Sequence, residues 1–106
     1  MIIINNTVQV KKGFADKLIQ RFDRPGNVES FEGFLGLKVL QKRGTADYDE
    51  IVINTLWESK EAHDAWARSD EFKKSHSGSR PEFIINNKIE LYDVVASREP
   101  KVEVNN

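Results

Sequence analysis

The sequence contains no cysteine among its 106 residues. Without thiols it has no disulfide, no thiolate zinc site, no iron–sulfur cluster and no thiol nucleophile. Long apolar runs are missing as well: the run from Ile2 to Ile4 is far too short for a membrane span, which needs ~20 residues, or for a signal peptide. With neither an export signal nor a disulfide, we expect a cytoplasmic protein with no membrane partner.

Motifs for binding nucleotides and for serine chemistry are also absent. The six glycines are scattered along the chain, and none belongs to a phosphate loop, a dinucleotide fingerprint or a serine elbow. A chain without a flavin or nicotinamide motif needs an external electron donor for any redox reaction that consumes electrons.

Charge and length indicate one small globular domain. Lys and Arg number 16 against 17 Asp and Glu, giving a formal net charge of -1, so no basic excess favours a nucleic-acid partner. A hydrophobic fraction of 39% suffices for one core, and 106 residues leave no room for a second. We expect one domain over residues 1–96, followed by a polar tail over residues 97–106.

The apolar residues of the first quarter change their spacing once. Before Gly13 they alternate as in a strand, at Ile2, Ile4, Val8 and Val10. After Gly13 they follow helical spacing, at Ala15, Leu18, Ile19 and Phe22. The Pro25-Gly26 pair is expected to end this helix.

Three further strands are expected over residues 37–41, 50–58 and 84–95, with a hairpin loop at 44–47 and another loop at 77–81. Ser59 is a good helix N-cap, and a second capping signal at Ser69 divides the helical segment in two. The acidic residues Asp47, Asp49 and Glu50 lack the spacing of a calcium loop, so we interpret them as a solvated turn.

The order strand, helix, strand, strand, helix, strand predicts an α+β fold of the ferredoxin-like βαββαβ type, with an antiparallel sheet and helices on one face. Two helices leave the second face of a four-stranded sheet bare. Because the strands are rich in Ile, Val, Leu and Trp, a second copy of the chain is the simplest cover. We therefore expect a homodimer, a dimeric α/β barrel.

Three residues do not fit an ordinary apolar core. Asn6 puts an amide on the inward face of the first strand, where it either bonds neighbouring backbone or points into a cavity. Trp66 shares a helix face with two alanines and either fills the core or forms the wall of a pocket. His76 shares a face with Phe72 and is either a surface residue or a metal ligand. As a lone protein ligand it suits a metal that brings its own equatorial donors, as heme does.

Several stretches together carry a family resemblance. The most specific is WARSDEFKKSH at residues 66–76, followed by IINN at residues 84–87. Further matches are NNTV at 5–8, LIQRF at 18–22, FEGFLG at 31–36 and TLWESK at 55–60. Over nearly the whole chain except the polar tail, the sequence resembles the IsdG-type heme-degrading monooxygenases, a branch of the antibiotic-biosynthesis-monooxygenase superfamily.

A catalytic triad of Asn, Trp and His occurs in that family, and its members match Asn6, Trp66 and His76 here. The resemblance implies that heme is both the substrate and the cofactor that activates O2. It gives His76 as the iron ligand and Asn6 as a hydrogen-bond donor on the opposite side of the ring. It also implies that Trp66 forces the porphyrin out of plane.

Further heme contacts are expected at three residues. Phe72 would pack near the ring, one helical turn before His76. Phe22 either lines the cavity or fills the core, and Arg21 either binds a heme propionate or is solvated. Electrons would come from an external reductase.

Three other functions are compatible with these residues. A cofactor-free monooxygenase of the same superfamily, acting on a phenolic or quinol substrate, would need no iron ligand. A heme carrier or sensor would use His76 but leave the ring intact. A noncatalytic dimeric module would use the three residues only structurally. If heme is degraded, the chromophore is either biliverdin-like or oxo-bilirubin-like, with carbon monoxide or formaldehyde as the lost carbon.

Overall fold

The computed structural model describes residues 1–22, 26, 28–75 and 80–101. Its elements are β1 (Ile2–Lys11), α1 (Ala15–Ile19), the 3-10 turns η1 (Gln20–Phe22) and η2 (Val28–Ser30), β2 (Phe34–Gln41), β3 (Tyr48–Trp57), α2 (Lys60–Ala67), α3 (Asp70–Ser75) and β4 (Ile84–Asp93). This order confirms the predicted succession of strands and helices.

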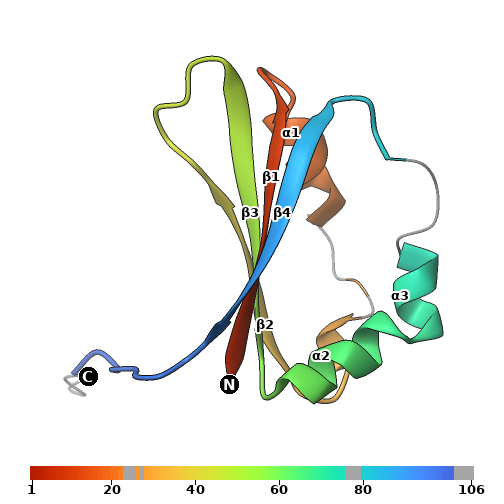
Figure 1. Cartoon of the computed structure of the whole chain (residues 1–106), viewed down its shortest axis with the longest axis vertical. Coiled ribbons are helices and arrows are strands. Elements are labelled where there is room, and N and C mark those ends of the chain that lie inside the picture. Colours follow the sequence, from red (N-terminus) through yellow and green to blue (C-terminus); the bar gives the residue numbers. More distant parts are fainter. Residues whose placement is uncertain (23–25, 27, 76–79, 102–106) are drawn as a thin grey trace, which may run out of the picture.

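The four strands form one antiparallel sheet in the order β2-β3-β1-β4. All helices lie on one side of this sheet (Figure 1). The central strand β1 places Asn6 opposite Ile53 of β3 and Ile89 of β4. An antiparallel sheet with helices on one face is the predicted ferredoxin-like α+β architecture.

Two serine side chains set the starts of the second and third helices. The Oγ of Ser59 accepts a hydrogen bond from the backbone nitrogen of Ala62 at 3.1 Å, which caps α2. The Oγ of Ser69 accepts one from the backbone nitrogen of Phe72 at 3.1 Å and so caps α3. Both capping predictions are confirmed, and the second cap turns the chain between Trp66 and Phe72.

The core lies between the sheet and the helices, and it consists of two separate clusters. One packs α1 on the second half of β1 and contains Val8, Val10, Ala15, Leu18 and Ile51. The other packs α2 on the first half of β1 and contains Ile2, Ile4, Trp57 and Trp66. Asn6 is the residue of this face that lies between Ile4 and Val8, so it interrupts the apolar row where the two clusters meet.

Gly33 fixes how closely α2 approaches the start of β2. Its φ of +88° is in the left-handed region, and a Cβ at this position would overlap the Cβ of Ala62. Its carbonyl oxygen also accepts a hydrogen bond from the backbone nitrogen of Glu58 at 2.8 Å, just before α2. A glycine is therefore required here both by the backbone and by the helix that packs against it.

Several boundaries differ from the sequence prediction. The α-helix expected through Phe22 ends at Ile19 and continues as a 3-10 turn, a common way for a last helical turn to tighten. β2 begins three residues earlier than expected, because Phe34 pairs with Trp57 of β3. The two rings also pack edge to face, with 5.3 Å between their centroids. The last strand ends at Asp93. The loop predicted at 77–81 lies partly outside the described residues.

The other face of the sheet carries no helix in the part of the chain that the structure describes (Figure 1). It mixes polar pairs with apolar side chains. The Nδ2 of Asn54 donates a hydrogen bond to the Oδ1 of Asn5 at 2.7 Å. The exposed side chains of Leu40 and Tyr92 lie on the same face, on either side of this pair. The predicted homodimer, whose copies would meet on this face, stays a prediction.

Candidate functional site

Asn6 is positioned by the middle of β1, on the helix-bearing face of the sheet. Its side chain is half-buried, and its Oδ1 accepts a hydrogen bond from the Nδ2 of Asn87 on β4 at 3.2 Å. No described residue accepts a hydrogen bond from the Nδ2 of Asn6. The amide therefore has its oxygen occupied by protein and its two N–H groups available to a ligand.

The surroundings of Asn6 are apolar and incompletely covered. Ile53 flanks it on β3 and Ile89 on β4, and Leu91 of β4 lies opposite Ile4 on the same face. Ile89 is 59% exposed and Leu91 47%, although both belong to the face that carries the helices. A flat apolar ligand on this face would remove both side chains from water, which is favourable by about 25 cal/mol per Å² of apolar area.

Trp66 projects from α2 into the second core cluster and is 7% exposed. Its ring packs edge to face against the rings of Phe31 and Phe72, with 5.5 Å and 5.7 Å between the ring centroids. Because it packs in the core, its orientation is rigidly held. Trp66 is therefore a core residue. A core residue can also form the wall of a pocket, so the second possible role of Trp66 stays a prediction.

Phe72 belongs to α3 and is half-buried against Trp66. α3 leads along the chain towards His76, the expected iron ligand, which lies outside the described residues. The structure thus brings two of the six predicted site residues, Trp66 and Phe72, into direct contact.

Arg21 and Phe22 lie in the 3-10 turn η1, which continues α1. Phe22 is 37% exposed, so it does not fill the core, which was one of its two possible roles. The guanidinium of Arg21 is exposed and makes no ion pair with a described residue. An exposed aromatic ring beside an unpaired cation suits a ligand that is both apolar and anionic.

Three residues of the site were not singled out by the sequence. These are Asn87, Ile89 and Leu91, all on β4. Residues 84–87 carried part of the family resemblance, but only the register of β4 on β1 shows that Asn87 reaches Asn6. The exposure of Ile89 and Leu91 follows from the position of β4 at the sheet edge, beyond the helices.

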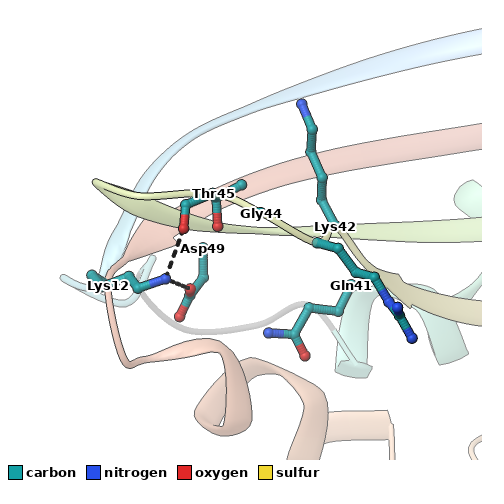
Figure 2. Close-up of a pocket in the computed structure, with 7 residues that line it drawn as sticks. Lys12, Gln41, Lys42, Gly44, Thr45 and Asp49 are labelled. Carbon is teal, nitrogen blue, oxygen red and sulfur yellow. Dashed lines mark hydrogen bonds and ion pairs between the residues drawn. The ribbon is translucent and has the colours of Figure 1, made fainter.

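A cavity of about 390 Å³ at the end of the β2–β3 hairpin is a different kind of site. It is lined by Lys12, Gln41, Lys42, Arg43, Gly44, Thr45 and Asp49. Figure 2 shows the Nζ of Lys12 between the carboxylate of Asp49, at 3.3 Å, and the backbone oxygen of Thr45, at 3.0 Å. Its polar, charged lining does not suit an apolar ring. Lys12 already pairs with Asp49 and donates a hydrogen bond to Thr45.

Asp49 in this cavity corrects one sequence interpretation. It is 6% exposed and not part of a solvated turn. Its pKa is lowered, mainly because the backbone nitrogen of Gly13 donates a hydrogen bond to its carboxylate and further because Lys12 lies beside it. The carboxylate is an anchor between β3 and the turn after β1.

A second cavity, of about 510 Å³, lies between η2 and α2 and is lined by Ser30, Phe31, Glu32, Gly33, Glu58, Ala62 and Ala65. Neither cavity includes a residue predicted to bind or act on a ligand. Among the described residues, no three His, Cys, Asp or Glu side chains lie together to hold a metal ion. In that same part of the chain, no helix is both long and apolar enough to cross a membrane.

Two solved structures resemble this fold. A crystal structure from Bacillus cereus, described as an antibiotic biosynthesis monooxygenase, has a TM-score of 0.82 and 35% identity, covering 92% of this chain and 96% of its own. The heme degrader MhuD of Mycobacterium tuberculosis, with two hemes bound in its active site, has a TM-score of 0.74 and 25% identity, covering 93% of this chain and 100% of its own.

Sequence comparison points the same way. A protein of Bacillus mycoides (strain KBAB4) named heme-degrading monooxygenase is 48% identical over 102 residues, which cover 94% of this chain and 95% of the relative. A protein of the same name from Bacillus cereus (strain B4264) is 49% identical over the same shares. Residues 1–78 match the family profile of the antibiotic biosynthesis monooxygenases. The chain therefore belongs to the antibiotic biosynthesis monooxygenase family.

Proposed function

We propose that this protein is a heme-degrading monooxygenase that opens the porphyrin ring with O2 and external electrons, releasing iron and a bilin-type chromophore. One observation carries the proposal: the apolar row of β1 is interrupted by Asn6, beside isoleucine and leucine side chains that the helices leave exposed. The names of relatives at 48% and 49% identity, and the hemes bound by MhuD, support heme as the ligand.

The residues present fit such a ligand in both of its chemical aspects. Heme is a flat apolar ring that carries two propionates. Ile89 and Leu91 offer apolar surface next to Asn6, and Phe22 adds an exposed aromatic ring. Arg21, without an ion pair among the described residues, is available to a propionate. These three kinds of contact are what a largely apolar dianion requires.

We assign the polar roles to two residues. His76 would ligate the iron, as the family resemblance implies. Asn6 would offer its N–H groups to the bound O2, where a fixed donor stabilises negative charge as it develops. Such a donor acts most strongly where water is excluded, and its aliphatic neighbours Ile53 and Ile89 provide that environment.

The aromatic residues shape the site. Trp66 is held by its contacts with Phe31 and Phe72, so its ring does not yield easily to a ligand pressed against it. In this proposal Trp66 would form a rigid wall against the bound porphyrin and fix the position of the ring carbons relative to the oxygen site. Phe72, which packs against Trp66, would contact the porphyrin as well.

Heme supplies the iron at which O2 is reduced and also the ring that is oxidised. The electrons come from a reductase outside this chain, because no flavin or nicotinamide motif occurs in the sequence.

A heme titration of the purified protein, followed by ascorbate in air with catalase present, tests the function. Loss of the Soret band together with release of chelatable iron is the expected result. A Soret band that survives the reductant indicates a heme carrier or sensor instead. If heme does not bind, a cofactor-free monooxygenase or a noncatalytic module becomes the better interpretation.

His76→Ala tests the iron ligand separately. The variant is expected to fold, and far-UV circular dichroism that matches the wild type would check this. Its heme spectrum is expected to lose the signature of the histidine ligand. His63→Ala is the matched control, since His63 is the second histidine of the sequence and packs on Trp57. Unchanged heme spectra in His76→Ala would contradict the assignment.

We also propose that the chain works as a homodimer whose copies pack through the uncovered sheet face. Leu40, 46% exposed, lies on that face opposite Val52. Leu40→Glu is expected to lower the apparent mass in sedimentation from dimer to monomer. Leu37→Glu is the matched control on the same strand, because Leu37 pairs with Thr55 on the helix-bearing face. Equal masses for the two variants would argue against this interface.

A further inference from the structure

We infer that Asn87 is a positioning residue that sets which end of the Asn6 amide faces the ligand. The inference rests on the proposed function, in which Asn6 must present N–H groups to the ligand. Asn87 itself is placed on the strand next to Asn6 and need not touch the ligand.

The register of the sheet explains why the two side chains meet. β1 and β4 run antiparallel side by side (Figure 1), with Val8 opposite Asn87 and Asn6 opposite Ile89. Asn6 and Asn87 are thus diagonal neighbours on the same face, a separation that polar side chains can span. The Nδ2 of Asn87 donates to the Oδ1 of Asn6 at 3.2 Å.

A primary amide has one accepting and one donating end, and a rotation of about 180° exchanges them. When Asn87 donates to the oxygen of Asn6, the nitrogen of Asn6 is the end left for a ligand. If the amide of Asn6 were reversed, its oxygen would face the site and would repel negative charge there. In the orientation that the structure shows, Asn87 turns its own nitrogen towards Asn6 and so leaves the nitrogen of Asn6 for the ligand.

Asn87→Asp is the sharpest test, because a carboxylate only accepts hydrogen bonds. The carboxylate would bond the N–H groups of Asn6 and turn the amide oxygen towards the ligand. Asn87→Leu removes the interaction without reversing it, and its effect should be intermediate. Asn86→Asp is the matched control: it adds the same charge one residue away, on the opposite face, where Asn86 pairs with Gln9.

Three measurements are compared across these variants. In the ligand-free protein, Asn6→Ala should shift the hydrogen-bonded Nδ2 proton of Asn87 in the NMR spectrum. With heme, reduced and exposed to carbon monoxide, Asn87→Asp should raise the C–O stretching frequency, because a donor near the bound gas lowers it. The ascorbate-driven rate of heme loss should fall by about 10- to 100-fold in Asn87→Asp. In Asn86→Asp both heme measurements should match the wild type.

The double variant Asn6→Ala/Asn87→Asp decides whether Asn87 acts through Asn6. If it does, adding Asn87→Asp to Asn6→Ala changes neither the C–O frequency nor the rate. A further loss in the double variant would mean that the new charge acts directly, and it would overturn the inference. An Asn87 Nδ2 proton that is unaffected by Asn6→Ala would overturn it as well.

Failure of the proposed function can be told apart from failure of this inference by how the wild-type protein behaves with heme. If the wild type binds heme without degrading it, the NMR shift and the C–O frequency still report on the amide pair, and the inference is judged on them. If the wild type binds no heme, the proposed function and the orientation towards heme both fail, whatever the NMR shift.

Discussion

The carboxylate of Asp49, at the start of β3, accepts a hydrogen bond from the backbone nitrogen of Gly13 at 2.8 Å, across 36 residues of sequence. The same carboxylate pairs with Lys12 at 3.3 Å. The turn that leads from β1 into α1 is thereby fixed to the far end of the hairpin. Because α1 is only five residues long, this attachment orients the turn η1 and its residues Arg21 and Phe22.

Asp49→Ala is expected to lower the free energy of unfolding at pH 7. The folded pKa of Asp49 lies below the usual 3.8, so its ionised form stabilises the fold above pH 4, and this stabilisation is lost as the pH falls through the folded pKa. Urea denaturation at pH 7 and at pH 3 should therefore show a difference between wild type and variant that narrows in acid. Asp47→Ala, at an exposed position of the same hairpin, is the control. A difference that stays constant with pH would contradict this role.

Gly33→Ala should destabilise the fold by about 3 kcal/mol, from the positive φ and from the overlap with Ala62. Gly44→Ala is the matched control, since its φ is +80° but no atom lies within 4 Å of the added Cβ, and it should cost about 1 kcal/mol. Urea denaturation measures both. Adding Ala62→Gly to Gly33→Ala should restore part of the loss, and its failure to do so would exclude the overlap as the cause.

Trp66→Ala should lower the free energy of unfolding by about 3–5 kcal/mol, because it empties a buried site in the second cluster. Trp66→Phe is the better test of activity, with an expected cost of about 1–2 kcal/mol. Trp57→Phe is the control in the same cluster, with a ring that is 1% exposed. We expect heme loss to slow in Trp66→Phe and not in Trp57→Phe. Equal slowing in both would point to a general loss of packing.

Ile89→Glu should weaken heme binding by at least about tenfold, because the carboxylate must lose water when the ring covers it. Since Ile89 is 59% exposed, the free energy of unfolding should change by no more than about 0.5 kcal/mol. Ile85→Glu, at a position on the same strand that is 51% exposed, is the matched control. Heme titrations of the two variants provide the measurement, and equal affinities would place the ligand elsewhere.

Local patterns in the sequence are enough to predict most of the fold. Alternation along β1 and the capping serines Ser59 and Ser69 act over a few residues, and the structure confirms them. The inward direction of Asn6 follows from the same alternation. The role of a residue that depends on contacts with distant residues could not be predicted from the sequence. Asp49 looks like a solvated acid of a loop, and only the structure shows that the backbone nitrogen of Gly13 donates a hydrogen bond to it.

The candidate site shows the same limit. Asn6 is visible in the sequence because it is polar within an apolar row, and Trp66 because it is a large ring beside two alanines. Asn87 and Ile89 are not, since their importance depends on the register of β4, and strand pairing across 81 residues leaves no local signal. The triad role of His76 rests on the family resemblance and stays a prediction.

The division of the core at Asn6 places the proposed ligand between two packing units. The α1 cluster and the α2 cluster are separate packing units on one sheet, and a ring seated between them would contact both. Binding only to the folded state adds stability in proportion to the logarithm of ligand concentration over Kd. A ligand seated there would therefore stabilise both packing units at once.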